Sequence, residues 1–209
     1  MARAISTKTL FEKVYKTFEF DGFWLLVFGV IAKGGFWIIY GNEKNGKTLF
    51  ALKLAEYLTK FENVLYVSAE EGTGKEFQSN AQRAKLDPSN SKIKFIEYID
   101  LISLRNKLSK RQSPRIVILD NITVYVDELK SGKLIKLKDD FPNTTFIFLA
   151  HEDKKEPSTA TAKLCKKLAK IIVRVVGLTA FVSGRCPGGI IVADEQKAIL
   201  YHGSQIAKK

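Results

Sequence analysis

The sequence predicts an α/β fold with a mostly parallel central sheet, helices on both faces and an antiparallel C-terminal extension. From residue 36 to residue 170, short apolar runs alternate with amphipathic segments, which is the pattern of repeated strand–helix units. The apolar runs are continuous, as expected of parallel strands that are buried on both faces. After residue 170 the runs are short and are separated by glycine-containing turns, which favours antiparallel strands.

The leader segment is predicted to form a helix that packs on the core, because Leu10, Phe11, Val14 and Phe18 recur at helical spacing. Strands are then predicted at residues 36–40, 64–68, 93–98, 115–120 and 144–150. Amphipathic helices are predicted at residues 47–60, 74–85, 101–111, 126–138 and 161–170. The C-terminal strands are predicted at residues 171–176, 179–183, 190–193 and 198–201.

Composition places the chain among globular proteins and excludes collagen-like and wholly disordered chains. It has 209 residues, of which 45% are hydrophobic and 27% are charged, and this length suffices to bury a core. We expect one domain over residues 1–209, with residues 1–35 as a leader on or beside the core. Lys and Arg number 34 against 22 Asp and Glu, so the net charge is +12. This charge suits an acidic partner such as nucleic acid, although a merely basic soluble protein has the same composition.

The sequence predicts neither a disulfide framework nor a membrane span. Cys165 and Cys186 are too few for a framework and lack the spacing of a structural zinc site, which indicates a reducing, intracellular compartment. Residues 23–41 are almost wholly apolar, but Lys33, Gly34 and Gly35 interrupt them at the centre. The second half of this stretch is therefore better interpreted as a buried strand.

A phosphate-binding loop follows the first predicted strand, where the sequence fits G-x-x-x-x-G-K-[ST]. Such a loop turns its backbone N–H groups toward phosphate oxygens, aided by the dipole of the helix that follows. Lys47 is expected to reach the β- and γ-phosphates of ATP, and Thr48 to ligate Mg²⁺. The predicted cofactor-binding residues are Gly41, Asn42, Glu43, Lys44, Asn45, Gly46, Lys47, Thr48 and Leu49.

Acidic residues end two further predicted strands. Asp120 ends the strand at 115–120, at the edge where open α/β sheets bind ligands, and it is the candidate Walker B ligand of Mg²⁺. An Asp at this position also commonly starts a turn. Glu70 and Glu71 end the strand at 64–68, and one of them is the candidate general base for water. A solvated acidic turn is the alternative interpretation of this pair.

These motifs resemble the core of the RecA superfamily. Residues 66–71, Tyr-Val-Ser-Ala-Glu-Glu, are similar to the Tyr-Val-Ser-Gly-Glu-Glu segment of RadA-type recombination ATPases. Residues 148–154 resemble the RadA strand that ends in His-x-x-Lys, and residues 183–189 resemble its Lys-Asn-Arg-Phe-Gly motif, with Ser183 in place of the lysine. The resemblance covers roughly residues 35–203, and such minimal cores look like the small Sak-type ATPases of phages and mobile elements.

The resemblance implies an ATPase that acts on single-stranded DNA in recombination, repair or replication. In this family the residue matching Glu70 activates water and the residue matching His151 senses the γ-phosphate, while Arg185 is a candidate finger across a subunit interface. Because hydrolysis should be slow without a charge from a neighbouring subunit, we further expect a homo-oligomer, either a ring or a filament, with DNA-stimulated hydrolysis. Recombination or replication proteins are the expected protein partners. The expected location is the cytoplasm of a bacterium or of a phage-infected host.

Basic residues indicate where DNA would bind. Residues 157–193 contain six basic residues and no acidic one. On a helix, four lysines of this segment share a narrow arc that could follow a phosphate backbone, although a solvated lysine face is the alternative. The polar loop at 151–162 adds two lysines, and the segment at 121–133 adds Tyr125, which is either a base-stacking residue or a core residue. The candidate DNA-binding residues are Lys154, Lys155, Lys163, Lys166, Lys167 and Lys170.

Other functions fit the same sequence. A nucleotide-gated loader or mediator module would work through protein contacts, with Phe18, Phe20, Phe23 and Trp24 of the leader as docking residues, although covering the core is the favoured interpretation of these aromatic residues. A replicative-helicase-like motor would share the core. A small-molecule kinase is disfavoured, because the sequence shows no basic lid motif and its tail is rich in predicted strands.

Overall fold

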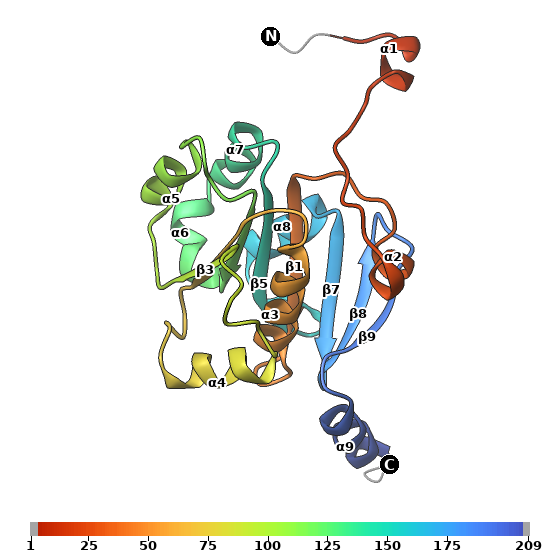
Figure 1. Cartoon of the computed structure of the whole chain (residues 1–209), viewed down its shortest axis with the longest axis vertical. Coiled ribbons are helices and arrows are strands. Elements are labelled where there is room, and N and C mark those ends of the chain that lie inside the picture. The colour runs from red at the N-terminus through yellow and green to blue at the C-terminus, as the bar shows by residue number, and fades with distance from the viewer. Residues whose placement is uncertain (1–3, 207–209) are drawn as a thin grey trace.

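The computed structural model describes residues 4–206, with side chains through residue 203. Its central sheet has the strand order β3-β2-β4-β5-β1-β7-β8-β9, and β6 pairs with β5 outside this path. The strands from β3 to β7 are parallel, whereas β8 and β9 are antiparallel additions (Figure 1). The predicted α/β fold with a parallel sheet and an antiparallel extension is therefore confirmed.

The elements alternate along the chain as the sequence predicts. The parallel strands are β1 (Gly35–Gly41), β2 (Val64–Ser68), β3 (Ile93–Ile96), β4 (Ile116–Asp120), β5 (Thr145–Asp153) and β7 (Ile171–Val176). The helices between them are α3 (Lys47–Leu58), α4 (Lys75–Arg83), α5 (Leu101–Leu108), η1 (Ile122–Tyr125), α6 (Val126–Leu129), α7 (Lys133–Asp140) and α8 (Ala160–Leu168). The remaining elements are α1 (Thr7–Phe11), α2 (Gly22–Phe28), β6 (Glu156–Pro157), β8 (Thr179–Gly184), β9 (Gly189–Val192) and α9 (Glu195–Ile206).

Helices cover both faces of the sheet, which explains the continuous apolar runs. In β1, Trp37 and Ile39 point into a core shared with α2, α3 and α4. Phe36 and Ile38 point to the opposite face, into a core shared with α5, α6, α7 and α8. Because successive strand residues face opposite sides, both sets must be apolar when both sides are buried.

The leader does not pack as predicted. Helix α1 has five residues and none of them is buried, and Phe11 and Val14 are 82% and 93% exposed. The chain joins the core only further on, where Thr17 bridges to Ala32 and the buried Phe18 stacks on Phe20. Figure 1 shows α1 standing away from the body of the molecule. The prediction of a helix that packs Leu10, Phe11 and Val14 on the core is therefore wrong, whereas Phe18 and the following part of the leader, including α2, do pack on the core.

Three other predicted elements are also corrected. The strand predicted at 198–201 is part of α9, whose start is fixed by the Asp194 carboxylate, which accepts a hydrogen bond from the Lys197 N–H. The helix predicted at 126–138 is divided into α6 and α7, because Ser131 and Gly132 adopt positive φ angles. In place of the polar loop predicted at 151–162, β5 continues to Asp153 and turns back into β6, and α8 begins at Ala160.

None of the helices in the part of the chain that the structure describes is both long and apolar enough to cross a membrane.

Candidate phosphate-binding site

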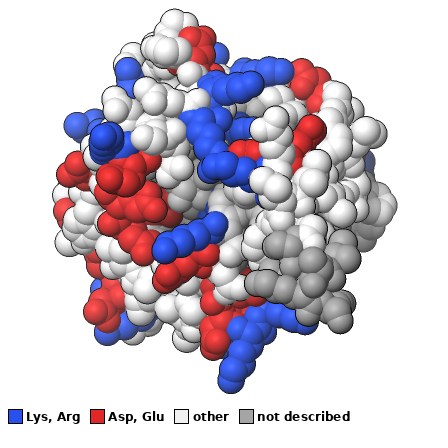
Figure 2. Space-filling view, turned by 90° about the horizontal axis from the view of Figure 1, so that it is seen from below, with Lys and Arg blue, Asp and Glu red and all other residues white. Residues whose placement is uncertain are grey.

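A cavity of about 600 Å³ lies at the edge of the sheet where β1, β2, β4 and β5 end. In Figure 1 this is the lower edge, toward α4 and α9, and Figure 2 views the molecule from there, with acidic groups beside basic ones. Open parallel sheets bind ligands at this edge. The cavity is lined by Glu43, Lys44, Gly46, Lys47, Thr48, Leu49, Glu70, Glu71, Asn80, Arg83, Asp120, His151, Leu178 and Lys197.

Two glycines shape the loop between β1 and α3 for different reasons. A Cβ on Gly41 would lie 2.3 Å from the carbonyl oxygen of Val175, so this glycine allows β7 to pass close to the end of β1. Gly46 has a φ of +92° at the start of α3, which is the left-handed conformation that favours glycine. The first-turn N–H groups of α3 have no partner within the helix, so they are available to an anion.

The loop is held from outside by the turn between β7 and β8. The side-chain oxygen of Asn45 accepts a hydrogen bond from the Gly177 N–H at 2.7 Å, and its carbonyl oxygen accepts one from the Leu178 N–H at 2.9 Å. The loop conformation therefore depends on the antiparallel extension as well as on its own sequence.

Lys47 is buried beneath the loop, and its side chain is anchored there by the Asn42 carbonyl oxygen, which accepts a hydrogen bond from Nζ at 3.0 Å. Burial lowers the pKa of the Lys47 ammonium, and the nearby carboxylates of Asp120 and Glu70 oppose this shift. An ammonium has three N–H donors, so this single bond leaves donors for phosphate oxygens.

Asp120 lies opposite Thr48, as predicted from the two motifs. Its Oδ2 accepts hydrogen bonds from Thr48 Oγ1 at 3.1 Å and from Tyr66 Oη at 2.8 Å. Burial raises the pKa of Asp120 to about 6, although both hydrogen bonds act in the opposite direction. A hydroxyl beside a carboxylate is a hard oxygen pair of the kind that Mg²⁺ prefers, so these residues fit a nucleotide-bound magnesium ion.

Glu70 is held through both of its carboxylate oxygens. Asn121 Nδ2 donates to Oε2 at 3.0 Å, and His151 Nε2 lies 3.1 Å from Oε1. Glu70 follows β2, Asn121 directly follows β4, and His151 lies in β5. Three strands therefore contribute to one cluster. Glu71 also lines the cavity. The geometry therefore distinguishes the two acids, because Glu70 has a carboxylate fixed by two side chains within the cavity.

Some residues that line the cavity, or support the residues that line it, were not predicted from the sequence. Tyr66 and Asn121 are buried polar groups that contact the predicted acids, and they lie within or directly after predicted strands. Arg83 and Lys197 come from α4 and α9, far from any motif. Arg83 Nη2 and Nε both donate to one oxygen, Asp194 Oδ2, at 2.6 Å and 3.0 Å. The sequence carried a hint only for Tyr66 and Asn121. Tyr66 interrupts a predicted apolar strand and Asn121 comes directly after one, so each is a polar group at a position expected to be buried.

Arg185 does not lie at this cavity. It follows β8, near the end of the sheet where the parallel strand β7 begins. There its backbone N–H donates to the Lys170 carbonyl oxygen, and its side chain is exposed. Arg185 therefore has no contact with the phosphate loop of its own chain.

The predicted stripe of four free lysines on α8 is wrong. Lys166 pairs with Glu156 at 2.8 Å, and its ammonium lies 4.9 Å from the centre of the Tyr40 ring. Lys170 lies beyond the end of α8 and donates to the carbonyl oxygens of Ala32 and Lys33. Only Lys163 and Lys167 of this set are exposed. Lys154 and Lys155 are also exposed, and they form the tip of the β5–β6 turn.

Tyr125 is a core residue, so it is not available to stack on a base. Its ring is fully buried, and its hydroxyl donates to the carbonyl oxygen of Ile99 at 2.9 Å. The segment at 121–133 forms η1 and α6 rather than an open loop.

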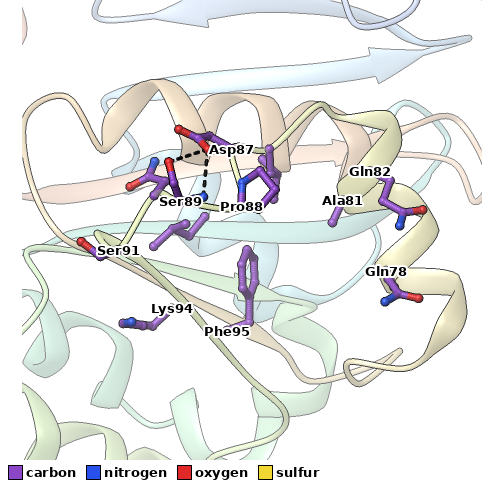
Figure 3. A pocket seen from close by; sticks show the side chains of 12 residues that line it. Gln78, Ala81, Gln82, Asp87, Pro88, Ser89, Ser91, Lys94 and Phe95 are labelled. Carbon is purple, nitrogen blue, oxygen red and sulfur yellow. Dashed lines mark hydrogen bonds between the residues drawn. The ribbon is translucent and has the colours of Figure 1, made fainter.

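A second cavity of similar volume lies between α4, the loop that follows it and β3 (Figure 3). Asp87 is turned toward its own loop, where it accepts hydrogen bonds from the N–H and hydroxyl of Ser89. None of the predicted nucleotide or magnesium residues lines this cavity. The candidate phosphate site is therefore the cavity at the ends of the parallel strands.

Sequence comparisons place the chain in no family, because no family model and no curated protein match it. Solved structures do match. The KaiC-like protein PH0186 from Pyrococcus horikoshii OT3 superposes with a TM-score of 0.60 at 18% identity, over 82% of this chain and 94% of that one. The flagellar accessory protein FlaH from Methanocaldococcus jannaschii gives a TM-score of 0.55 at 20% identity, over 78% of this chain and 85% of that one. The chain therefore has the fold of the RecA-like ATPases.

Proposed function

We propose that this protein binds ATP with Mg²⁺ and hydrolyses it. The observation that carries the proposal is the arrangement around the phosphate loop, where a buried lysine, a Thr–Asp oxygen pair and a fixed carboxylate face one cavity. Each has a distinct role in phosphoryl transfer, in which positioning and electrostatic stabilisation supply most of the catalysis.

In this proposal the first-turn N–H groups of α3 and the Lys47 ammonium bind the phosphates. Thr48 and Asp120 hold the magnesium ion, which when bound neutralises charge that develops on the phosphates. Glu70 orients a water molecule and accepts its proton, since its carboxylate is fixed within the same cavity. His151 would sense the γ-phosphate, as the resemblance to RadA-type ATPases implies, and its contact with Glu70 would link that signal to the general base.

Calorimetry and a phosphate-release assay test this proposal. Wild-type protein should bind ATP in the presence of Mg²⁺, and Lys47→Ala should lose most of this binding while remaining folded. Hydrolysis equal to that of Lys47→Ala, or no detectable ATP binding at millimolar concentration, would refute the proposal. Lys53→Ala is a matched control, because Lys53 lies in the same helix but donates to the carbonyl oxygen of Ala193.

We further propose single-stranded DNA as the acidic partner. Support comes from the net charge of +12 and from exposed lysines at the β5–β6 turn, which directly follows His151 in β5. Lys154 is three residues from His151, which contacts Glu70. A polyanion bound at Lys154 and Lys155 would therefore be connected to the Glu70 cluster through the end of β5. Single-stranded DNA should raise the hydrolysis rate, and a Lys154→Ala/Lys155→Ala double variant should weaken that effect. An equal response in this variant would exclude the turn as the binding element.

A loader or mediator role is the second candidate, because apolar residues of the leader are exposed. Of the docking residues predicted from the sequence, Phe18 and Phe20 are buried in the core and Trp24 is partly buried against Tyr57, so they are corrected to packing residues, whereas Phe23 is exposed. Leu10, Phe11, Val14 and Tyr15 are each at least half exposed, and no residue between 4 and 16 is buried. Deletion of residues 1–15, which keeps the Lys16 carbonyl oxygen that accepts from the Lys33 N–H, should therefore leave the melting temperature and the ATPase rate unchanged. Loss of partner recruitment in this variant would favour the mediator role, whereas loss of DNA-stimulated hydrolysis would count against it.

A further inference from the structure

The residue directly after the Walker B acid is buried and polar, although no motif assigns it a role. Asn121 is 1% exposed and follows Asp120 at the end of β4. A buried amide has two donors and one acceptor to satisfy, so its partners show what the fold uses it for. Asn121 has partners on both ends of its amide.

The oxygen end of this amide caps a helix. Asn121 Oδ1 accepts a hydrogen bond from the Thr123 N–H at 3.1 Å and one from the Thr123 hydroxyl at 3.2 Å, at the start of η1. Such a cap requires an acceptor, because the first N–H groups of a helix lack partners within it. The cap therefore determines which end of the amide is oxygen and turns the NH₂ group in the other direction.

The NH₂ group is directed at the proposed general base. Asn121 Nδ2 donates to Glu70 Oε2 at 3.0 Å, while His151 contacts the other carboxylate oxygen. Glu70 is itself 46% exposed, so without such partners its side chain would be free to adopt several rotamers. An amide whose orientation is fixed by a helix cap is a rigid donor, and it costs little further ordering when Glu70 binds to it.

We propose that Asn121 is a positioning residue, which fixes the Glu70 carboxylate for attack by water and acts on the reaction only through Glu70. This inference rests on the proposed ATPase function. Asn121 does not contact the nucleotide in this role, so it should affect turnover and leave ATP affinity nearly unchanged. General-base catalysis contributes about 10²–10⁴ in rate, and a misplaced base loses part of this factor.

The variant that isolates this contact is Asn121→Ser. Serine is also a good helix cap, so η1 keeps its acceptor, but its hydroxyl is too short to reach Glu70. We expect kcat to fall about tenfold or more, with the KM and the calorimetric Kd for ATP within about twofold. Asn121→Asp keeps the cap and the shape but places a second carboxylate against Glu70, so it should reduce kcat at least as much. Thr123→Val is the control, because it removes only the hydroxyl contact to Oδ1.

A double-mutant cycle with Glu70→Gln distinguishes positioning from general damage. If Asn121 acts through Glu70, adding Asn121→Ser to Glu70→Gln should lower the residual single-turnover rate no further. Independent losses in the cycle, an unchanged kcat in Asn121→Ser, or a higher kcat would each overturn the inference. Absence of ATP binding in the wild type would instead refute the proposed function, so the two failures have different signatures.

Discussion

Replacement of Asp120 by Asn should stabilise the nucleotide-free protein while it weakens binding of Mg²⁺ and ATP. The Asp120 carboxylate is 8% exposed, and burial raises its pKa from 3.8 to about 6. The folded state therefore binds a proton more tightly than the unfolded chain. The stability that this group contributes is fully present below pH 3.8 and is lost as the pH rises through 6.

The size of the effect follows from the two pKa values. The difference between 3.8 and about 6 corresponds to about 3 kcal/mol of destabilisation when Asp120 is ionised in both states. Asn keeps an oxygen that accepts from Tyr66 and Thr48, but its NH₂ group needs a new partner, which offsets part of the gain. We expect Asp120→Asn to raise the free energy of unfolding by about 1–2 kcal/mol at pH 8, and by about 1 kcal/mol less at pH 5.

Urea denaturation with EDTA and without nucleotide measures this difference at both pH values, and the fluorescence of Trp24 and Trp37 reports unfolding. Asp139→Asn is the matched control, because Asp139 is exposed and should change stability by less than about 0.5 kcal/mol. A variant that is less stable than wild type at pH 8, or a gain of equal size at both pH values, would refute the reasoning. Calorimetry on the same material should show weaker binding of ATP with Mg²⁺.

Two further substitutions test the framework of the site. Gly46→Ala should lower stability by about 1–3 kcal/mol, because φ is +92° and the new Cβ would lie 2.5 Å from Leu178 Cδ2; an unchanged melting temperature would contradict this. Arg83→Ala should slightly lower the melting temperature, because it leaves Asp194 Oδ2 without the arginine that donates to it twice. Combining Arg83→Ala with Asp194→Asn should give less than the sum of the single effects, and strictly additive effects would show that the ion pair is energetically unimportant.

The sequence predicted an element correctly where its residue pattern is compatible with only one type of secondary structure. The strand at 64–68 agrees with β2, because a five-residue apolar run between a helix and two acids has no room for a helix. Residues 198–201 are also mostly apolar, but they are helical. Their helix depends on the Asp194 cap and on the β7–β8 turn, where the Tyr201 ring lies so close to Gly177 that a Cβ there would clash with it. Leu10, Phe11 and Val14 have helical spacing, yet spacing alone does not show whether a helix finds a surface to pack on.

The site was predictable only for the residues that a local motif connects. The phosphate loop is continuous in sequence, and the acids at the ends of β2 and β4 meet it because parallel strands end at one edge. The support of these acids by Tyr66, Asn121 and His151 depends on which strands are neighbours and on where each side chain points. The lysines near α8 show that a local pattern can also mislead. Their spacing is helical, but Lys166 is paired with Glu156 and Lys170 donates to two carbonyl oxygens, so neither is free for a partner.

The charges of the site are arranged so that a ligand completes them. Burial shifts the pKa of Lys47 downward and that of Asp120 upward, so desolvation opposes the charged form of both groups. The two do not neutralise each other directly, because Lys47 donates to the Asn42 carbonyl oxygen and Asp120 accepts from two hydroxyl groups. A phosphate beside Lys47 and a divalent cation beside Asp120 would each supply the missing opposite charge. Binding of ATP with Mg²⁺ should therefore raise the melting temperature through the folded state alone, and each ligand should strengthen the binding of the other.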